Sequence, residues 1–236
     1  MSGLRRSVVV LVGAALLAAC SAPPTSPPVA SSPVGPSPVA SSPAPPPSVA
    51  PSPAPAVSSA APPLRFVFPV RGKASYGTTH AGYPATDIFA GCGTPVVAVT
   101  SGRMLEVSRV DRYTATGPQG PDNGGRSVSL LGDDGVRYYG SHLLTVAPGI
   151  GAGVRVVAGQ RLGAVGRTGH ANGVCHLHFG VSPPCARTGD WWIRRGVVWP
   201  APFLDGWRAG RQVGAGSAVR AWHRDHGCPA APPGSP

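Results

Sequence analysis

Three observations in the sequence predict an all-β domain of antiparallel strands. Apolar residues from Leu64 onward recur mostly with a period of two, as in strands that bury one face. The turn Asp133-Asp134-Gly135 lies between two such segments, and an Asp-Gly pair in that setting is a strong hairpin signal. No window of a dozen residues carries a clear helical stripe. The predicted class is therefore all-β, a single antiparallel sheet or sandwich.

The expected strands are short and are separated by Gly, Pro and Asp. They cover residues 66–70, 94–99, 102–108, 126–131, 136–142, 154–157, 161–165 and 175–181. Residues 64–207 are therefore predicted to form the folded domain, and residues 208–236 a tail. A core of about 145 residues can bury most of its unfolded surface without extra crosslinks.

Residues 1–63 are predicted to lie outside this domain. A short basic segment followed by the apolar run 8–19 is typical of a secretory signal peptide. The run ends Leu17-Ala18-Ala19-Cys20, which resembles the lipobox of bacterial lipoproteins. That resemblance implies removal of residues 1–19, lipidation of Cys20 and anchoring to the outer face of the cytoplasmic membrane. The alternative is an ordinary signal peptide with an incidental cysteine.

The segment between Cys20 and the domain has an unusual composition. Residues 21–63 contain 16 prolines and no charged or aromatic side chain. Such a sequence has too little large apolar surface to offset the entropy of ordering. Residues 20–63 are therefore interpreted as a lipidated cysteine followed by a disordered tether.

The whole chain is basic, with 20 Lys and Arg against 9 Asp and Glu and a net charge of +11. The cations are dispersed, and within the domain no basic run is longer than Arg194-Arg195. A dispersed positive field suits any polyanion, including a carboxylate-rich cell wall. We expect no nucleic-acid partner.

Four cysteines follow Cys20. In an exported protein their even number predicts two disulfides, and four cysteines allow three pairings. We favour Cys175–Cys185, which would clamp the end of a strand, together with Cys92–Cys228, which would tie the tail to the domain.

The histidines are the residues that most specifically indicate a chemical function. In Cys175-His176-Leu177-His178-Phe179, a strand would place the two imidazoles on one face, with Cα atoms about 6.6 Å apart. Alone, this pattern is equally compatible with two surface histidines. His142, His80 and Asp87 add a context in which two histidines and one carboxylate could hold a zinc ion and leave a position open for water. The sole glutamate, Glu106, excludes a His-Glu-x-x-His helix.

From Phe66 to about Pro184 the chain resembles the lysostaphin/LytM-type peptidoglycan metallopeptidases. Five motifs carry the resemblance in the right order: His80 with Asp87, Gly93-Thr-Pro-Val-Val-Ala98, Tyr139-Gly-Ser-His142-Leu143, Gly166-Arg-Thr-Gly169 and His176-Leu-His-Phe179. The resemblance implies the fold of that family and one Zn²⁺ per chain.

Residue roles follow from the same resemblance. It implies that His80, Asp87 and His178 are the zinc ligands and that His142 and His176 are the catalytic pair. Six residues separate His80 from Asp87, where many family members have three, so residues 83–86 are interpreted as a variant loop. Asp87 remains the candidate because no other acid precedes it.

Other candidate features receive simpler interpretations. His170 is expected to be an exposed loop residue, and His223 and His226 are not expected to form a second metal site. The glycines between residues 159 and 169 lack the Gly-Lys-Ser/Thr of a phosphate loop. Cys175 beside His176 is expected to be a disulfide cysteine, not a nucleophile. The aromatic segment 191–207 is expected to extend the core, with glycan stacking as the alternative.

The predicted function is zinc-dependent hydrolysis of amide bonds in the peptide part of peptidoglycan, by a monomer whose only membrane contact is its lipid. The alternatives are a catalytically inactive relative that binds the wall or activates another hydrolase, and a polyanion-binding module. The sequence does not identify the bond that is cut.

Overall fold

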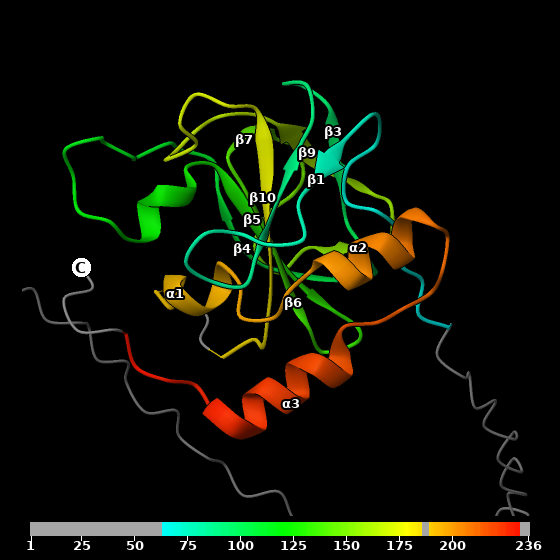
Figure 1. The fold of residues 1–236 in the computed structure, drawn as a ribbon. Helices are drawn as coiled ribbons and strands as arrows, with labels where there is room; N and C mark the ends of the chain where they lie inside the picture. The colour runs from blue at the N-terminus through cyan, green and yellow to red at the C-terminus, as the bar shows by residue number, and fades with distance from the viewer. Residues whose placement is uncertain (1–62, 186–188, 232–236) are drawn as a thin grey trace, which may run out of the picture. The chain divides into compact units, whose positions relative to one another are not determined.

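The computed structural model describes residues 63–185 and 189–231, which belong to one compact unit (Figure 1). The predicted signal peptide, Cys20 and the tether as far as Pro62 lie outside the described residues. Within the described ranges, no helix is both long and apolar enough to cross a membrane.

Two antiparallel sheets make up the domain. The larger has the strand order β1-β2-β10-β6-β5-β4-β8, and the smaller has the order β3-β9-β7. In the larger sheet the strands are β1 (Ser75–Tyr76), β2 (Thr86–Phe89), β4 (Gly102–Ser108), β5 (Ser127–Gly132), β6 (Arg137–Ser141), β8 (Arg155–Val156) and β10 (His176–Ser182). In the smaller sheet they are β3 (Pro95–Val97), β7 (Leu143–Val146) and β9 (Arg161–Val165). The all-β, antiparallel prediction is confirmed.

Several strands begin and end where the sequence places them. β4 and β9 have the predicted bounds, and Asp133-Asp134-Gly135 joins β5 to β6. Gly135 has a φ of 78°, a left-handed conformation that glycine adopts without a steric cost. The predicted strand 66–70 is instead extended chain with a single bridge from Val70 to Val96, because Pro69 has no N–H to donate to a ladder.

The core lies where the alternating apolar residues meet. On β10, Leu177 and Phe179 are buried in the main hydrophobic cluster with Ile88 and Leu130. His176 and His178 belong to the opposite face of the same strand, because successive side chains alternate. One strand therefore contributes both to the core and to a histidine-bearing face.

Three helices follow the last strand: α1 (Trp191–Arg194), α2 (Ala201–Arg208) and α3 (Gly216–His226) (Figure 1). Trp207 is 4% exposed and stacks on Phe66, and Leu204 and Val219 also lie in the core. The aromatic segment thus extends the core through Trp207, although Trp199 remains exposed. Sequence analysis missed these helices because α1 and α2 are too short to show a full helical stripe, and it assigned α3 to the tail.

The predicted disulfide pairing is wrong. Cys92 is bonded to Cys175, and Cys185 is bonded to Cys228. The first pair forms because β2 and β10 are antiparallel neighbours, with His176 opposite Phe89, which brings the residues just beyond β2 close to those just before β10. The sequence did not predict β2, so this proximity was not visible.

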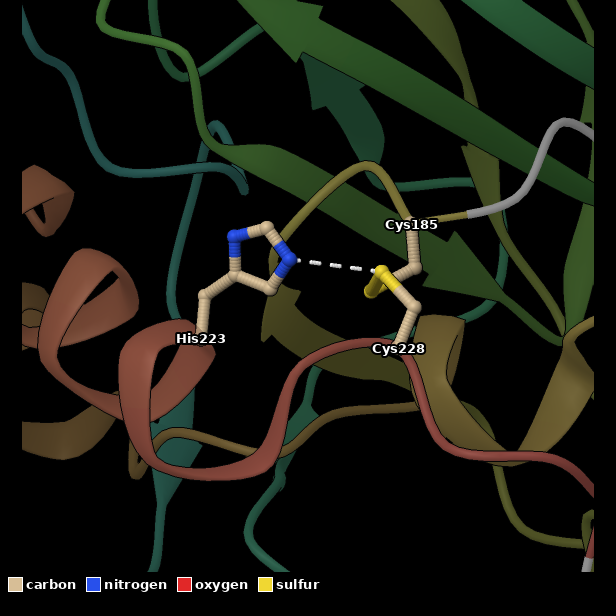
Figure 2. Close-up of side chains that lie close together, drawn as sticks. All are labelled: Cys185, His223 and Cys228. Carbon is tan, nitrogen blue, oxygen red and sulfur yellow. Dashed lines mark hydrogen bonds between the residues drawn. A yellow bond between two sulfur atoms is a disulfide. The ribbon is translucent and has the colours of Figure 1, made fainter.

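The second disulfide joins the segment after β10 to the residues that follow α3. Figure 2 shows this bond with the His223 ring beside it, and His223 Nε2 lies 3.3 Å from Cys228 Sγ. The C-terminal helix is therefore covalently tied to the end of the strand that carries His176 and His178.

Candidate metal and catalytic site

Two neighbouring strands bring the predicted ligands together. In the antiparallel register of β2 and β10, Asp87 lies directly opposite His178. His178 Nδ1 is 3.1 Å from Asp87 Oδ1, and His80 Nε2 is 3.7 Å from Asp87 Oδ2. The three residues can each offer one ligand atom such that all three atoms lie within 4.8 Å of one another. The register of one strand pair therefore assembles two of the three groups, and the loop before β2 supplies the third.

A backbone carbonyl fixes the orientation of His178. His178 Nε2 is 2.8 Å from the carbonyl oxygen of Arg195. A carbonyl only accepts hydrogen bonds, so Nε2 carries the proton and Nδ1 presents its lone pair toward Asp87 and His80. Metal-binding histidines are commonly oriented by such a contact at the other ring nitrogen.

Close packing of backbone makes this contact possible. Gly180 lies on β10 two residues beyond His178, and a Cβ at Gly180 would collide with the Arg195 carbonyl. Because glycine has no Cβ, the residues after α1 can lie directly against β10. Gly180 thus allows the Arg195 carbonyl to reach His178.

The charge states of His80 and Asp87 favour the binding of a cation. Burial lowers the pKa of His80, aided by the neighbouring His178, so its imidazole is neutral at neutral pH. Burial alone would raise the pKa of Asp87, but the close contact with His178 and the other surrounding histidines outweigh it and lower that pKa. A neutral imidazole at His80 and a charged carboxylate at Asp87 are protonation states that metal ligands require.

The spacing of these groups fits a small divalent ion. Bonds of about 2.0–2.2 Å in a tetrahedral zinc site place ligand atoms about 3.3–3.6 Å apart. The contacts of 3.1 and 3.7 Å, which involve the two different oxygens of Asp87, lie just below and just above that range. Three protein ligands, two nitrogen and one oxygen, are also typical of zinc sites that keep a position open for catalysis.

His142 and His176 lie beside the cluster without joining it. Their ring centroids are 4.7 Å apart. His142 Nδ1 donates to the Thr168 carbonyl at 2.8 Å, and His176 Nδ1 donates to the Val174 carbonyl at 2.9 Å. In each ring Nε2 therefore retains its lone pair when the imidazole is neutral.

Burial controls the protonation of His142. Its side chain is buried, and burial together with the nearby His178 and His176 lowers the pKa of His142 to about 3. His176 Nε2 lies 3.8 Å from Asp87 Oδ1, so the second imidazole is directed at the ligand cluster. The pair can accept a proton from a group bound next to the three ligands.

His142 lies where the chain crosses between the two sheets. Ser141 ends β6 in the larger sheet, and Leu143 begins β7 in the smaller one. Between them His142 has a φ of 63°, a left-handed conformation that costs a non-glycine residue of the order of 1 kcal/mol. Its backbone N–H donates to the Gly124 carbonyl at 2.9 Å. This corner directs the imidazole toward β10.

All five residues line one cavity of about 550 Å³. Asp87 is the only acidic residue in its lining within residues 63–185 and 189–231. The remaining lining is uncharged or cationic, and its larger side chains are Tyr83, Phe89, Gln119, Tyr139, His170, Trp191, Arg194 and Arg195. A concave site with convergent polar groups and shifted pKa values is the expected form of an active site.

Some of these lining residues were not predicted. Arg195 was treated only as part of a dispersed positive charge, and no local pattern marks it as a site residue. Tyr83 was assigned to a variant loop, although its ring lies 4.5 Å from that of His80. His170 is exposed, as predicted, but it also lines the cavity and stacks on Tyr113.

A second group of potential metal ligands lies far along the chain. Cys185, His223 and Cys228 have their ligand atoms within 4.8 Å of one another. Both sulfurs are in a disulfide (Figure 2), and the thiolate is the form of cysteine that binds metals. The oxidised pair is therefore a crosslink, and the absence of a metal site at His223 and His226 stays a prediction.

Fold and site together define a β-sheet protein with a His₂Asp cluster and two adjacent imidazoles in a cleft. Residues 80–188 match Peptidase family M23. These residues form a peptidase M23 domain, homologous to the lysostaphin/LytM endopeptidases.

Two curated relatives match parts of the chain. The glycyl-glycine endopeptidase ALE-1 of Staphylococcus capitis is 33% identical over 109 residues, which cover 46% of this chain and 26% of the relative. The L-Ala–D-Glu endopeptidase of Bacillus subtilis is 29% identical over 157 residues, which cover 60% of this chain and 43% of the relative. The chain thus spans less than half of the length of either relative.

Among solved structures, the catalytic domain of lysostaphin from Staphylococcus simulans matches 57% of this chain and 90% of its own, with 28% identity and a TM-score of 0.41. A putative glycyl-glycine endopeptidase lytM from Ruminococcus gnavus matches 62% of both chains, with 24% identity and a TM-score of 0.48.

Proposed function

We propose that this protein is a zinc-dependent endopeptidase that hydrolyses amide bonds in the peptide part of peptidoglycan. The observation that carries the proposal is the convergence of His80, Asp87 and His178 next to two imidazoles that do not belong to the ligand set. The M23 match and the peptidase names of both relatives support the reaction class.

A zinc ion bound by these three residues would supply Lewis-acid chemistry to a water molecule and to the scissile carbonyl. His142 and His176 transfer the protons during the reaction. The lone pair at Nε2 of either ring can accept a proton as water attacks the carbonyl carbon. The resulting imidazolium stabilises the negative charge that develops on the carbonyl oxygen and returns the proton to the leaving amine. No covalent intermediate is required.

We also propose the location inferred from the N-terminus: export, cleavage before Cys20 and attachment of a lipid to that cysteine. The two disulfides support an oxidising compartment, since such bonds are rare in reducing cytosol. Peptidoglycan is the partner in this proposal, and the protein acts as a monomer. The inactive-relative alternative is weakened because all five candidate positions carry the residues that hydrolysis needs.

The test is digestion of purified sacculi followed by mass spectrometry of the released muropeptides, with and without a chelator. The oxidised protein should release peptide-cleaved fragments, and the chelator should stop the release. His178→Ala should be inactive and free of metal, whereas His226→Ala, which alters an exposed histidine on α3, should behave as the unmodified protein. Full activity of His178→Ala, or activity that resists the chelator, would contradict the proposal.

A further inference from the structure

Arg195 is a cation in the cleft that lacks an ionic partner among the described residues. Its guanidinium carbon lies 3.9 Å from the ring centroid of Tyr83 and 4.8 Å from that of Trp191. Its neighbour Arg194 is paired with Glu106 at 3.0 Å. No Asp or Glu forms an ion pair with Arg195 within residues 63–185 and 189–231, although it lines the cavity.

The surroundings of Arg195 leave its charge incompletely compensated. Its Nε is buried and has no hydrogen-bond partner in the described part of the chain, and partial burial lowers the pKa of its guanidinium. Aromatic faces attract a cation but provide no hydrogen-bond acceptor of carboxylate strength. A buried N–H donor without a hydrogen-bond acceptor has a free-energy cost. A ligand that brings an anionic acceptor to Arg195 therefore gains binding free energy.

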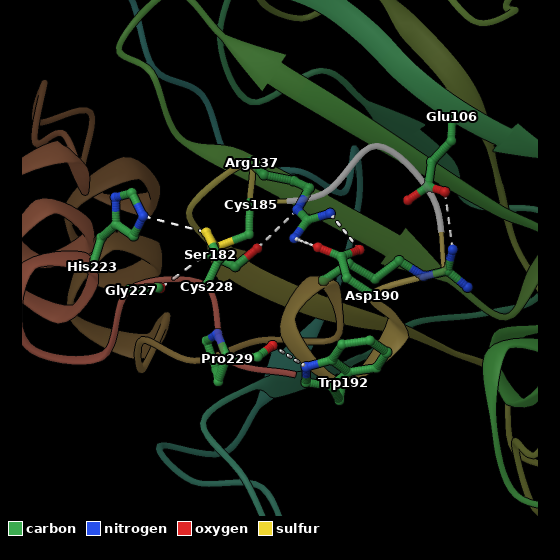
Figure 3. Close-up of polar contacts among 11 residues, drawn as sticks. Glu106, Arg137, Ser182, Cys185, Asp190, Trp192, His223, Gly227, Cys228 and Pro229 are labelled. Carbon is green, nitrogen blue, oxygen red and sulfur yellow. Dashed lines mark hydrogen bonds and ion pairs between the residues drawn. A yellow bond between two sulfur atoms is a disulfide. The ribbon is translucent and has the colours of Figure 1, made fainter. Parts of the chain in front are cut away.

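The segment that carries Arg195 is held firmly from several sides. Asp190, which precedes α1, pairs with the buried Arg137 at 2.7 Å. Trp192 Nε1 donates to the Pro229 carbonyl at 3.3 Å, close to the disulfide that fixes Cys228. Figure 3 shows these contacts together with the Glu106 ion pair on the other side of the segment. The position of Arg195 is therefore set before a ligand arrives, which reduces the entropy lost on binding.

The same residue contacts the metal-binding cluster through its backbone. The Arg195 carbonyl accepts the proton of His178 Nε2 at 2.8 Å, and Tyr83, over which the guanidinium lies, has its ring 4.5 Å from that of His80. The guanidinium of Arg195 thus contacts a ring, Tyr83, that itself lies beside the predicted zinc ligand His80. Among the described residues, Asp87 is the only acid that lines the cavity, and it belongs to the ligand cluster, which leaves the substrate as the source of a negative charge for Arg195.

We propose that Arg195, held between Tyr83 and Trp191, binds a free carboxylate of the substrate next to the bond that is cut, and so selects stem peptides with a free carboxyl group over amidated or polyglycine segments. This inference rests on the proposed peptidase function. A planar guanidinium suits the task because it can donate two parallel hydrogen bonds to one carboxylate. A peptide carboxylate is favoured over a polyanionic glycan because the cation lies inside the cleft and close to the ligand cluster.

The test uses matched soluble stem peptides that differ only in whether one carboxyl group is free or amidated. One pair varies the glutamyl carboxyl group, and a second pair varies the carboxyl group of the diamino acid. For at least one pair, the oxidised, zinc-loaded protein should cleave the free acid with a kcat/KM about 10- to 100-fold higher than the amide, the range of a charge-assisted hydrogen bond. Arg195→Gln should remove that preference by slowing cleavage of the acid alone.

Two further variants separate recognition from a structural role. Arg195→Lys keeps the charge but loses the planar fork, so it should restore only part of the preference. Arg208→Gln is the matched control, because Arg208 also lies over two rings, Phe68 and Tyr76, outside the cleft; its preference should equal that of the unmodified protein. Zinc content should be unchanged in all three variants, since the backbone carbonyl at position 195 is retained.

The outcomes distinguish this inference from the proposed function. If the unmodified protein cleaves acids and amides equally, or if Arg195→Gln slows both equally, carboxylate selection is overturned while the peptidase function stands. If no peptide is cleaved, equilibrium binding of the same pairs decides: tighter binding of the acid that disappears in Arg195→Gln supports the Arg195 site without the hydrolase. Equal binding of acid and amide would overturn it. Loss of binding to intact sacculi with no change on the peptides would assign Arg195 to a wall polyanion instead.

Discussion

Two walls of the cleft are built in different ways. The strand wall comprises Asp87, His142, His176 and His178, which lie on β2, on β10 and at the junction of β6 and β7. The helix wall comprises Tyr83, Trp191 and Arg195, which lie in the loop before β2 and around α1. Backbone ladders position the strand wall, whereas an ion pair, a disulfide and cation–π contacts position the helix wall.

This difference suggests a division of labour. A strand register fixes side chains to within a fraction of an ångström, as metal binding and proton transfer require. Loops and short helices can vary without disturbing the sheets, so they are the natural place for substrate selection. In the proposed function, the strand wall would provide the chemistry and the helix wall would select the peptide. Three variants examine this division, beginning with the largest expected effect.

Asp87→Ala should abolish both metal binding and hydrolysis, because it removes the carboxylate that contacts both His178 and His80. Zinc content by elemental analysis and muropeptide release report the two losses. The far-ultraviolet circular dichroism spectrum should keep its β-sheet form, since Asp87 contributes to the ladder through its backbone. A variant that retains zinc would exclude Asp87 from the ligand set.

His142→Ala should separate catalysis from metal binding within the strand wall. Loss of a general acid or base lowers the rate by about 10²- to 10⁴-fold, so kcat should fall by that amount while zinc content stays at one per chain. Preference for free-acid peptides should survive in the residual activity, because the helix wall is intact. Loss of zinc in this variant would place His142 among the ligands.

Gly180→Ala examines the contact between the two walls. A methyl group there would collide with the Arg195 carbonyl and displace it from His178, and loss of such an orienting contact typically costs about 10- to 100-fold in metal affinity or activity. Competition with a chelator measures the affinity. Gly151→Ala is the matched control, because a Cβ at Gly151 meets no atom within 4 Å. Equal zinc affinity in both variants would show that the carbonyl contact is dispensable.

Local sequence patterns predicted most of the strand wall. Period-two alternation and an Asp-Gly turn predicted the strands around β4 to β6, and His-x-His on β10 follows from the same alternation. The resemblance to known metallopeptidases supplied His80 and Asp87, and the structure brings both next to His178. The ligand roles of these residues stay predictions until a metal is measured.

The helix wall could not be predicted because its contacts are distant in sequence. Arg195 meets Tyr83 only after β10 has paired with β2 and α1 has packed against β10, and nothing in residues 191–195 indicates that partner. The four-residue β2 was missed for a similar reason: its pairing with β10 joins segments about 90 residues apart. The incorrect cysteine pairing follows directly from that omission.

The bond between Cys92 and Cys175 has a consequence for fidelity during folding. A slip of one residue between β2 and β10 would turn Asp87 toward the core and away from His178, since side chains alternate along a strand. The crosslink joins the residues that flank these two strands at the same edge, so once it has formed the strands have little freedom to slide. The disulfide thereby restrains the register that places Asp87 opposite His178.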